Sequence, residues 1–167
     1  MAEKNGINNY SKEEYGEHYQ EHILEMYKMY VEMADNISKR RMETNNFFIS
    51  INTLLLSIMT LLLNYDGLTV YGKTWIGVSV IGLLLSWTWF YLLKSYRLLN
   101  SGKFKVVHEI ERLLPVSPYD IEWDKLGRGK DRKKYWPISH IEVVLPAIMG
   151  GCYLVIIILN IWRLCTC

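Results

Sequence analysis

Three long segments without a single Lys, Arg, Asp or Glu constrain the fold of this chain more than any other feature of its sequence. They run from Phe47 to Leu63 (17 residues), from Ile76 to Leu93 (18 residues) and from Val143 to Trp162 (20 residues). A bilayer core about 30 Å thick is crossed by roughly 20 helical residues, so each segment is long enough to span a membrane. Buried helices of a soluble bundle usually keep a charged face, which makes a soluble bundle the weaker interpretation. The sequence therefore predicts an all-α membrane protein with three transmembrane helices and a helical cytoplasmic domain.

The averaged composition hides this pattern. With 167 residues, 50% apolar residues and a net charge of +2, the chain has the averages of an ordinary soluble domain. Its length excludes a large multidomain enzyme, and its 3 cysteines exclude a disulfide-stapled secreted domain.

The basic residues alternate between the segments that join the three spans. Residues 1–46 hold 6 Lys and Arg, the 64–75 loop holds 1, residues 94–142 hold 11, and 1 follows Trp162. Because basic residues are retained on the cytoplasmic side, the N-terminus is expected to be cytoplasmic and the C-terminus external. The expected topology is a cytoplasmic amphipathic helix (1–46), a first span (47–64), an external loop (65–75), a second span (76–93), a cytoplasmic helical segment (94–142), a third span (143–162) and an external tail (163–167).

The segment before the first span has helical character. Apolar residues recur at helical spacing from Ile23 to Ile37, and no Pro or Gly interrupts residues 17–64. This predicts one helix that continues into the first span and reaches roughly 70 Å. Its apolar stripe needs a partner outside the membrane, which is either the 94–142 segment or the same helix of a neighbouring subunit. The net charges of −3 in residues 1–46 and +4 in 94–142 favour association of these two segments.

The second span is also expected to continue as a helix beyond the membrane. It should end before Pro115 or Pro118, since the residue before a proline avoids helical geometry. Asn100, Ser101 and Gly102 indicate a break in it, and a short helix from Tyr119 to Leu126 is expected to follow.

A polar stripe within the first span is the strongest candidate for a functional surface. Its members recur at steps of 4, 3, 4, 3 and 4, which places them on one helix face: Asn46, Ser50, Thr53, Ser57, Thr60 and Asn64. Polar residues in a span rarely face lipid without cause. The stripe either packs against other helices or lines a watery pore at the centre of several copies, and the sequence leaves both interpretations open. Because the stripe holds no charge, such a pore should be weakly ion-selective.

Two further sets of residues are candidates for contact surfaces. One is a basic stretch before the third span: Lys125, Arg128, Lys130, Arg132, Lys133 and Lys134. It suits the anionic inner leaflet, with RNA binding as the alternative. The other set consists of small residues that let spans approach closely and favour a tightly packed homo-oligomer: Ser79, Gly82, Ser86, Gly150 and Gly151. Pro146 and Gly150 are expected to kink the third span.

The sequence contains no pattern that predicts catalysis, a metal or a cofactor. His18 and His22 stand four residues apart, but the glutamates around them favour a solvated acidic face over a metal pair. A HEPN-type RNase needs an Arg followed by a His after four to six residues. The pairs Arg97–His108 and Arg132–His140, with ten and seven residues between, do not fit that spacing.

Several segments together resemble a known family. These are Tyr27 to Arg41 leading into Asn45-Asn46-Phe47-Phe48, then Tyr96 to Phe104, Leu113-Leu114-Pro115, Tyr119 to Trp123, and His140-Ile141-Glu142. The chain resembles the small bacterial inner-membrane proteins grouped as RipA-type octameric membrane proteins. It is also similar to the membrane accessory protein encoded beside the RNA-guided RNase of type VI-B CRISPR systems.

The resemblance implies an octameric, pore-like assembly in the bacterial inner membrane, with a periplasmic C-terminus and a cytoplasmic vestibule. It implies a role in antiviral defence, in which the pore permeabilises or depolarises the membrane once the RNA-guided RNase recognises phage RNA. The expected partners are other copies of the chain and the bilayer, with functional coupling to that RNase and no nucleic acid. The relative has been described with a divergent HEPN-type motif. This chain lacks the required spacing, which argues against an RNase role. The alternatives to a pore are a membrane-anchored RNase, with RNA on the basic stretch, and a membrane scaffold without a pore.

Overall fold

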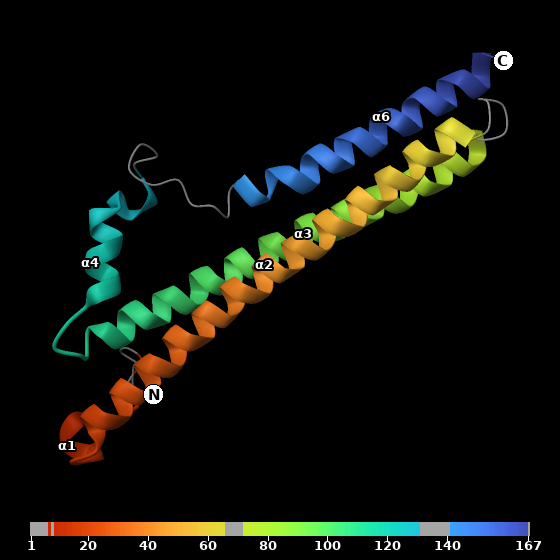
Figure 1. Ribbon diagram of the computed structural model, residues 1–167. Helices are drawn as coiled ribbons and strands as arrows, with labels where there is room; N and C mark the ends of the chain where they lie inside the picture. The colour runs from red at the N-terminus through yellow and green to blue at the C-terminus, as the bar shows by residue number, and fades with distance from the viewer. Residues whose placement is uncertain (1–6, 8, 66–71, 131–140, 167) are drawn as a thin grey trace, which may run out of the picture. The chain divides into compact units, whose positions relative to one another are not determined.

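A computed structural model describes residue 7 and residues 9–65, 72–130 and 141–166 of the chain (Figure 1). The described residues form helices and turns and include no strand. The elements are α1 (Lys12–Tyr15), α2 (Tyr19–Tyr65), α3 (Gly72–Glu111), α4 (Pro118–Lys125), the 3₁₀ turn η1 (Gly127–Gly129) and α6 (Val144–Thr166).

Three of these helices are long and apolar enough to cross a membrane, namely α2, α3 and α6. The predicted all-α architecture with three spanning helices is thus confirmed. The predicted continuity of the first helix is also confirmed, because α2 runs unbroken for 47 residues. A helix of this length reaches roughly 70 Å, more than twice the thickness of a bilayer core.

The break expected at residues 100–102 is wrong, since α3 continues without interruption to Glu111. A glycine in a helix interior costs about 1 kcal/mol relative to alanine. Packing beyond the glycine outweighs this cost, because Val107, Ile110 and Glu111 are all buried. The helix ends before Pro115, as predicted, and the short helix expected from Tyr119 is present as α4.

α6 is one continuous helix that includes Pro146 and Gly150, the two residues expected to kink the third span. Pro146 lies in its first turn, where a backbone N–H has no partner within the helix, so the proline removes no hydrogen bond. Gly150 is accommodated within the helix and is buried.

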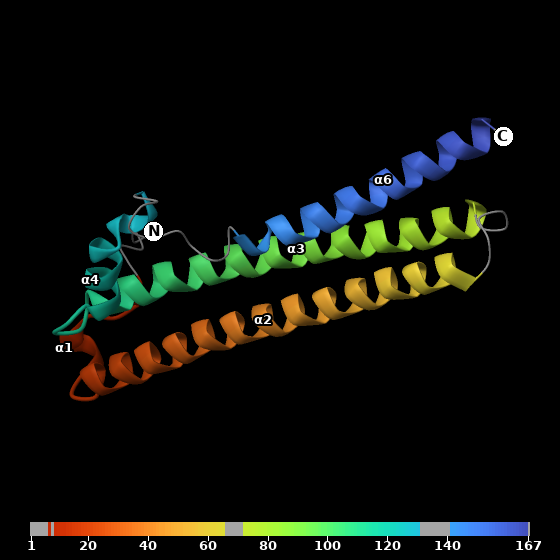
Figure 2. The ribbon, with the colours of Figure 1, turned by 45° about the horizontal axis from the view of Figure 1, so that its top comes forward.

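The chain divides into two compact units. Unit 1 consists of the described residues of Met1–Arg40 and Tyr96–Pro137, and unit 2 of those of Arg41–Ser95 and Ile138–Cys167. In each unit a segment of α2 lies beside a segment of α3 that runs in the opposite direction (Figure 2). Unit 1 joins residues from both segments that were predicted to associate through opposite charge. Unit 2 brings the apolar parts of α2 and α3 together with α6.

Candidate functional site

The polar stripe of the first span lies on the free surface of α2 in unit 2. Asn46, Ser50, Thr53, Ser57 and Thr60 are all exposed, while the side chain of Asn64 lies outside the described residues. The buried positions of the same stretch are Phe48, Asn52 and Met59. At 3.6 residues per turn, the stripe lies roughly 140° around the helix from this buried face. None of the described helices of unit 2 covers the exposed residues of the stripe.

Hydroxyl groups of the stripe are satisfied by their own helix. The Ser57 hydroxyl donates to the Thr53 carbonyl at 2.8 Å, and the Thr60 hydroxyl donates to the Leu56 carbonyl at 2.9 Å. Such bonds to the preceding turn remove the penalty for an unpaired donor in a spanning helix. The oxygen lone pairs still face outward and can accept a hydrogen bond from water or from a neighbouring helix.

A second polar face of α2, which the sequence analysis missed, points into unit 2. The indole N–H of Trp89 donates to the Asn45 side-chain oxygen at 3.1 Å, and the Trp89 ring stacks on Phe48 with a centroid distance of 5.9 Å. The Asn52 amide donates to the Phe48 carbonyl at 2.8 Å. Asn45 and Asn52 stand seven residues apart, on a face other than that of the stripe. Because the stripe repeats every seven residues as well, only the position within that repeat separates Asn45 and Asn52 from Asn46.

The small residues of α3 face α6 within unit 2. Ser79, Gly82 and Ser86 are buried, and a Cβ built on Gly82 would lie only 2.4 Å from the Tyr153 ring. A Cβ on Gly150 would lie 3.6 Å from that of Ser86. The Tyr153 ring therefore packs directly against the backbone of Gly82, and a side chain at position 82 would displace the ring.

Gly151 differs from the other small residues of the spans. It is exposed, and a Cβ built on it would meet nothing within 4 Å. It takes no part in the packing of α6 on α3.

An ion pair joins α2 to the residues just before α6. Arg41 Nε lies 3.2 Å from Glu142 Oε2, and both side chains are less than one-fifth exposed. This pair lies at the charged end of the first span, next to the stretch that carries the polar stripe.

The basic stretch is only partly described. Lys125 and Lys130 are exposed, whereas Arg132, Lys133, Lys134 and the RNase candidate His140 lie outside the described residues. Arg128 is held by carboxylates of α4, because it hydrogen-bonds Asp124 and lies 3.6 Å from Asp120. The hydrogen bond from Arg128 lowers the pKa of Asp124, and the same bond raises the pKa of Arg128. Arg128 is thus paired with carboxylates of its own segment, although its side chain is 52% exposed.

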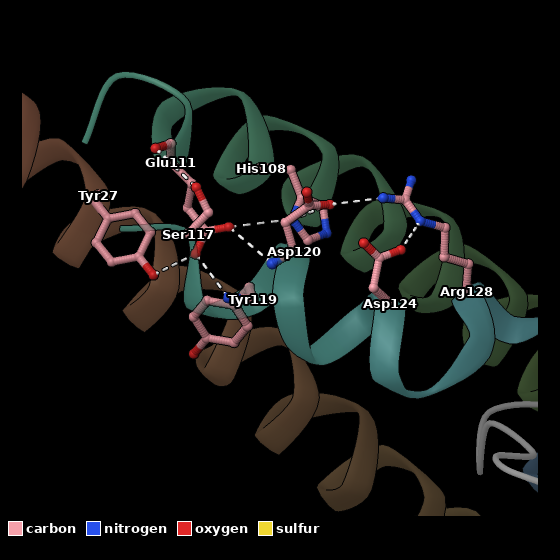
Figure 3. A network of polar contacts seen from close by, with 8 residues as sticks. All are labelled: Tyr27, His108, Glu111, Ser117, Tyr119, Asp120, Asp124 and Arg128. Carbon is pink, nitrogen blue, oxygen red and sulfur yellow. Dashed lines mark hydrogen bonds and ion pairs between the residues drawn. The ribbon is translucent and has the colours of Figure 1, made fainter. Parts of the chain in front are cut away.

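Unit 1 is organised around a buried carboxylate that the sequence analysis did not identify. Glu111 is 0% exposed at the end of α3. Its Oε1 accepts hydrogen bonds from the Tyr27 hydroxyl of α2 and from the Tyr119 N–H of α4, both at 2.9 Å, and its Oε2 accepts from the Asp120 N–H at 3.1 Å. Figure 3 shows these groups converging on one side chain. One carboxylate therefore ties three helices together.

Glu111 also replaces the usual cap of α4. Ser117 stands at the N-cap position but makes no side-chain cap, and its hydroxyl donates instead to the Glu111 carbonyl at 3.3 Å. The free N–H groups in the first turn of α4 are thus satisfied by a residue of the preceding helix. A carboxylate at a helix N-terminus is further favoured by the helix dipole.

Two tyrosines and a histidine surround this carboxylate. Burial, followed by the hydrogen bond to Glu111, raises the pKa of the Tyr27 hydroxyl well above its usual value. Burial and the charge of Asp35 raise the pKa of Tyr119. His108 Nδ1 lies 3.5 Å from Glu111 and 4.0 Å from Asp120. A histidine that faces two carboxylates is a poor contact for an RNA phosphate, because the surrounding charge is negative.

Residues 9–65, 72–130 and 141–166 contain no group of three or more His, Cys, Asp or Glu that could hold a metal ion. His18 and His22 stack on each other with a centroid distance of 5.8 Å. Each ring has a nearby partner, since His18 lies 3.2 Å from Glu21 and His22 lies 2.8 Å from the Tyr15 hydroxyl.

Three helices that are long and apolar enough to cross a membrane define a helical membrane protein. The family model of the octameric membrane protein family (8xMP) matches residues 24–162. The chain belongs to this family, which confirms its resemblance to the octameric membrane proteins. No curated protein and no solved structure matches the chain.

Proposed function

We propose that the chain assembles into a homo-octamer in which the polar stripe of α2 lines a central, water-filled pore. The exposed position of the stripe carries this proposal. A stripe buried within its own subunit could not line a pore. The described members of this stripe are instead all exposed in the subunit: Asn46, Ser50, Thr53, Ser57 and Thr60. In a ring of copies, this face is available to the common axis.

The number of subunits sets the width that such a pore would have. Helices pack with their axes about 8–10 Å apart. Eight α2 helices side by side, each with a radius of about 5 Å, would enclose a lumen of roughly 11–16 Å. A lumen of this width, lined by hydroxyl and amide groups without charge, passes small ions and dyes with little selectivity.

The biological role proposed for this pore is antiviral. The N-terminus and the 94–142 segment would be cytoplasmic and the C-terminus periplasmic, as the distribution of basic residues favours. Opening would depolarise or permeabilise the inner membrane when an RNA-guided RNase has recognised phage RNA. This role rests on the resemblance to the CRISPR accessory protein, and it assigns the chain no catalytic activity.

The experiment compares two leucine variants in proteoliposomes loaded with a small dye. Thr53→Leu with Ser57→Leu removes two hydroxyls from the stripe. Thr88→Leu is the matched control, because Thr88 is also an exposed threonine of a spanning helix and donates to the Leu84 carbonyl at 2.9 Å. The expected result is loss of dye release in the double variant alone.

Unchanged release from a well-inserted double variant would refute the pore lining. In that case the stripe packs against neighbouring helices, which is the scaffold interpretation. Equal loss in both variants would show that the effect is not specific to α2.

A further inference from the structure

An octamer of membrane-spanning subunits needs two different contact surfaces on each subunit. All copies share one orientation in the bilayer, so two-fold axes in the membrane plane are excluded and the ring is cyclic. Neighbours in such a ring meet head to tail, through unlike surfaces. This reasoning rests on the proposed octamer and not on the presence of a pore.

The first candidate surface is a methionine ridge on α2 in unit 1, formed by Met26, Met29 and Met33. These side chains are 45%, 45% and 42% exposed, at steps of three and four residues. Glu25 and Glu32 flank the ridge and are exposed, which places it in water rather than in lipid. Methionine side chains adapt readily to a partner surface. Burial of an apolar ridge against a partner is favourable, because it removes apolar surface from water.

The second candidate surface, named here the α4 knob, consists of Ile121 and Lys125 on the outer side of α4 and of Val116, which precedes this helix. Val116 is 67% exposed and Ile121 is 54% exposed, and Lys125 follows Ile121 by one helical turn. The opposite side of α4 is seated within unit 1. Its Tyr119 ring packs against Tyr27 with a centroid distance of 6.5 Å.

The two surfaces lie on opposite sides of unit 1. Tyr27 marks the side of α2 on which α4 sits (Figure 3). Met29, the middle residue of the ridge, lies roughly 160° around the helix from Tyr27, and Met26 and Met33 lie roughly 100° and 120° from it. Lys103 of α3 closes the ridge on its inner edge, with Nζ 3.8 Å from the Met33 sulfur. A subunit therefore presents the methionine ridge on one side and the α4 knob on the other, as a head-to-tail ring requires.

We propose that the methionine ridge of one subunit binds the α4 knob of the next subunit around the ring. Apolar side chains meet in the centre of this contact, and charges complement each other at its edge. Glu25 and Glu32 border the ridge with negative charge. Lys125 gives the knob a positive charge beside the exposed Glu122, and the neighbouring Asp124 is bonded to Arg128. The occupant of the ridge is a second copy of this chain.

Cross-linking between differently tagged full-length chains tests the contact. In a background with Cys152, Cys165 and Cys167 replaced by Ser, a Met29→Cys chain is co-expressed with an Ile121→Cys chain and oxidised in membranes. The expected product is a disulfide-linked dimer that carries both tags. Leu24→Cys replaces Met29→Cys in the matched control, because Leu24 is an exposed apolar residue on another face of α2.

Absence of the mixed dimer from an intact octamer would overturn the proposal, as would equal cross-linking of the Leu24→Cys control. Charge reversal provides a second readout by native mass spectrometry. Glu25→Lys or Lys125→Glu alone should reduce the octamer fraction, and the double reversal should restore it. If the double variant restores nothing, Lys125 does not meet this edge of the ridge.

The cross-link and the dye-release assay fail independently. A mixed dimer together with dye release that ignores Thr53 and Ser57 leaves the interface standing and removes the pore lining. If dye release depends on Thr53 and Ser57 but no mixed dimer forms, the pore lining stands and the proposed interface is removed.

Discussion

Replacing Glu111 by glutamine should release α4 from unit 1. The buried carboxylate accepts three hydrogen bonds, of which Oε2 receives the Asp120 N–H at 3.1 Å. In Glu111→Gln one oxygen can still serve Tyr27 and Tyr119, but the new amide N–H₂ then faces the Asp120 N–H, donor against donor. The loss of one hydrogen bond to a buried charge costs about 1.5–3 kcal/mol. Because α4 has only 8 residues, this loss should appear as local opening rather than global unfolding.

Hydrogen–deuterium exchange measures that opening directly. A cost of about 1.5–3 kcal/mol corresponds to exchange of the peptide over residues 117–126 that is about 10 to 150 times faster. Peptides from α6 should exchange at the same rate as before. Glu109→Gln is the matched control, since Glu109 is an exposed glutamate of the same helix and the charge change is identical. The capping role of Glu111 is refuted if the two variants exchange alike over this peptide.

Three further perturbations have defined outcomes. Gly82→Ala should lower the free energy of unfolding in detergent by about 1–3 kcal/mol, because the new methyl group overlaps the Tyr153 ring of α6. Gly77→Ala is the control and should not destabilise the protein, since a Cβ there meets nothing within 4 Å. Tyr27→Phe should abolish part of the alkaline sensitivity of unit 1. Because the pKa of Tyr27 is raised, its stabilising contribution is complete below pH about 10, the ordinary tyrosine pKa, and is lost progressively as the pH rises from there toward the raised value. The difference in hydrogen exchange between wild type and variant should therefore shrink as the pH rises beyond about 10. Glu142→Gln should lower the melting temperature, because it leaves the Arg41 guanidinium unpaired. The charge-swapped double variant Arg41→Glu with Glu142→Arg should recover part of this loss. Equal melting temperatures of wild type and both variants would show that the ion pair contributes nothing.

The spans and the long first helix were predictable because they follow from local rules. Charge-free runs of spanning length need only be counted, and no Pro or Gly interrupts α2 between Tyr19 and Tyr65. The break expected at Gly102 was wrong because helix propensity is a weak local term. Gly102 stays helical because the end of α3 packs against α2, and this tertiary contact cannot be read from the sequence around the glycine.

The candidate site was predictable only in part. Regular spacing identified the stripe from Asn46 to Asn64, and the structure adds that its described members are exposed. Glu111 was not identified, because its partners stand 84 residues before it in Tyr27 and 8 residues after it in Tyr119. In the sequence it is one glutamate among the charged residues of a polar segment. Only the fold removes it from water.

Thiol accessibility tests most directly whether the polar stripe faces the aqueous axis of an octamer. In the background without native cysteines, single-channel current is recorded from Thr53→Cys and Ile148→Cys before and after a charged, membrane-impermeant thiol reagent. Ile148 is the control because it is 57% exposed on the spanning part of α6. The reagent should reduce the current through Thr53→Cys and leave the current through Ile148→Cys unchanged. An unmodified current through Thr53→Cys, or a block through Ile148→Cys, would contradict this prediction.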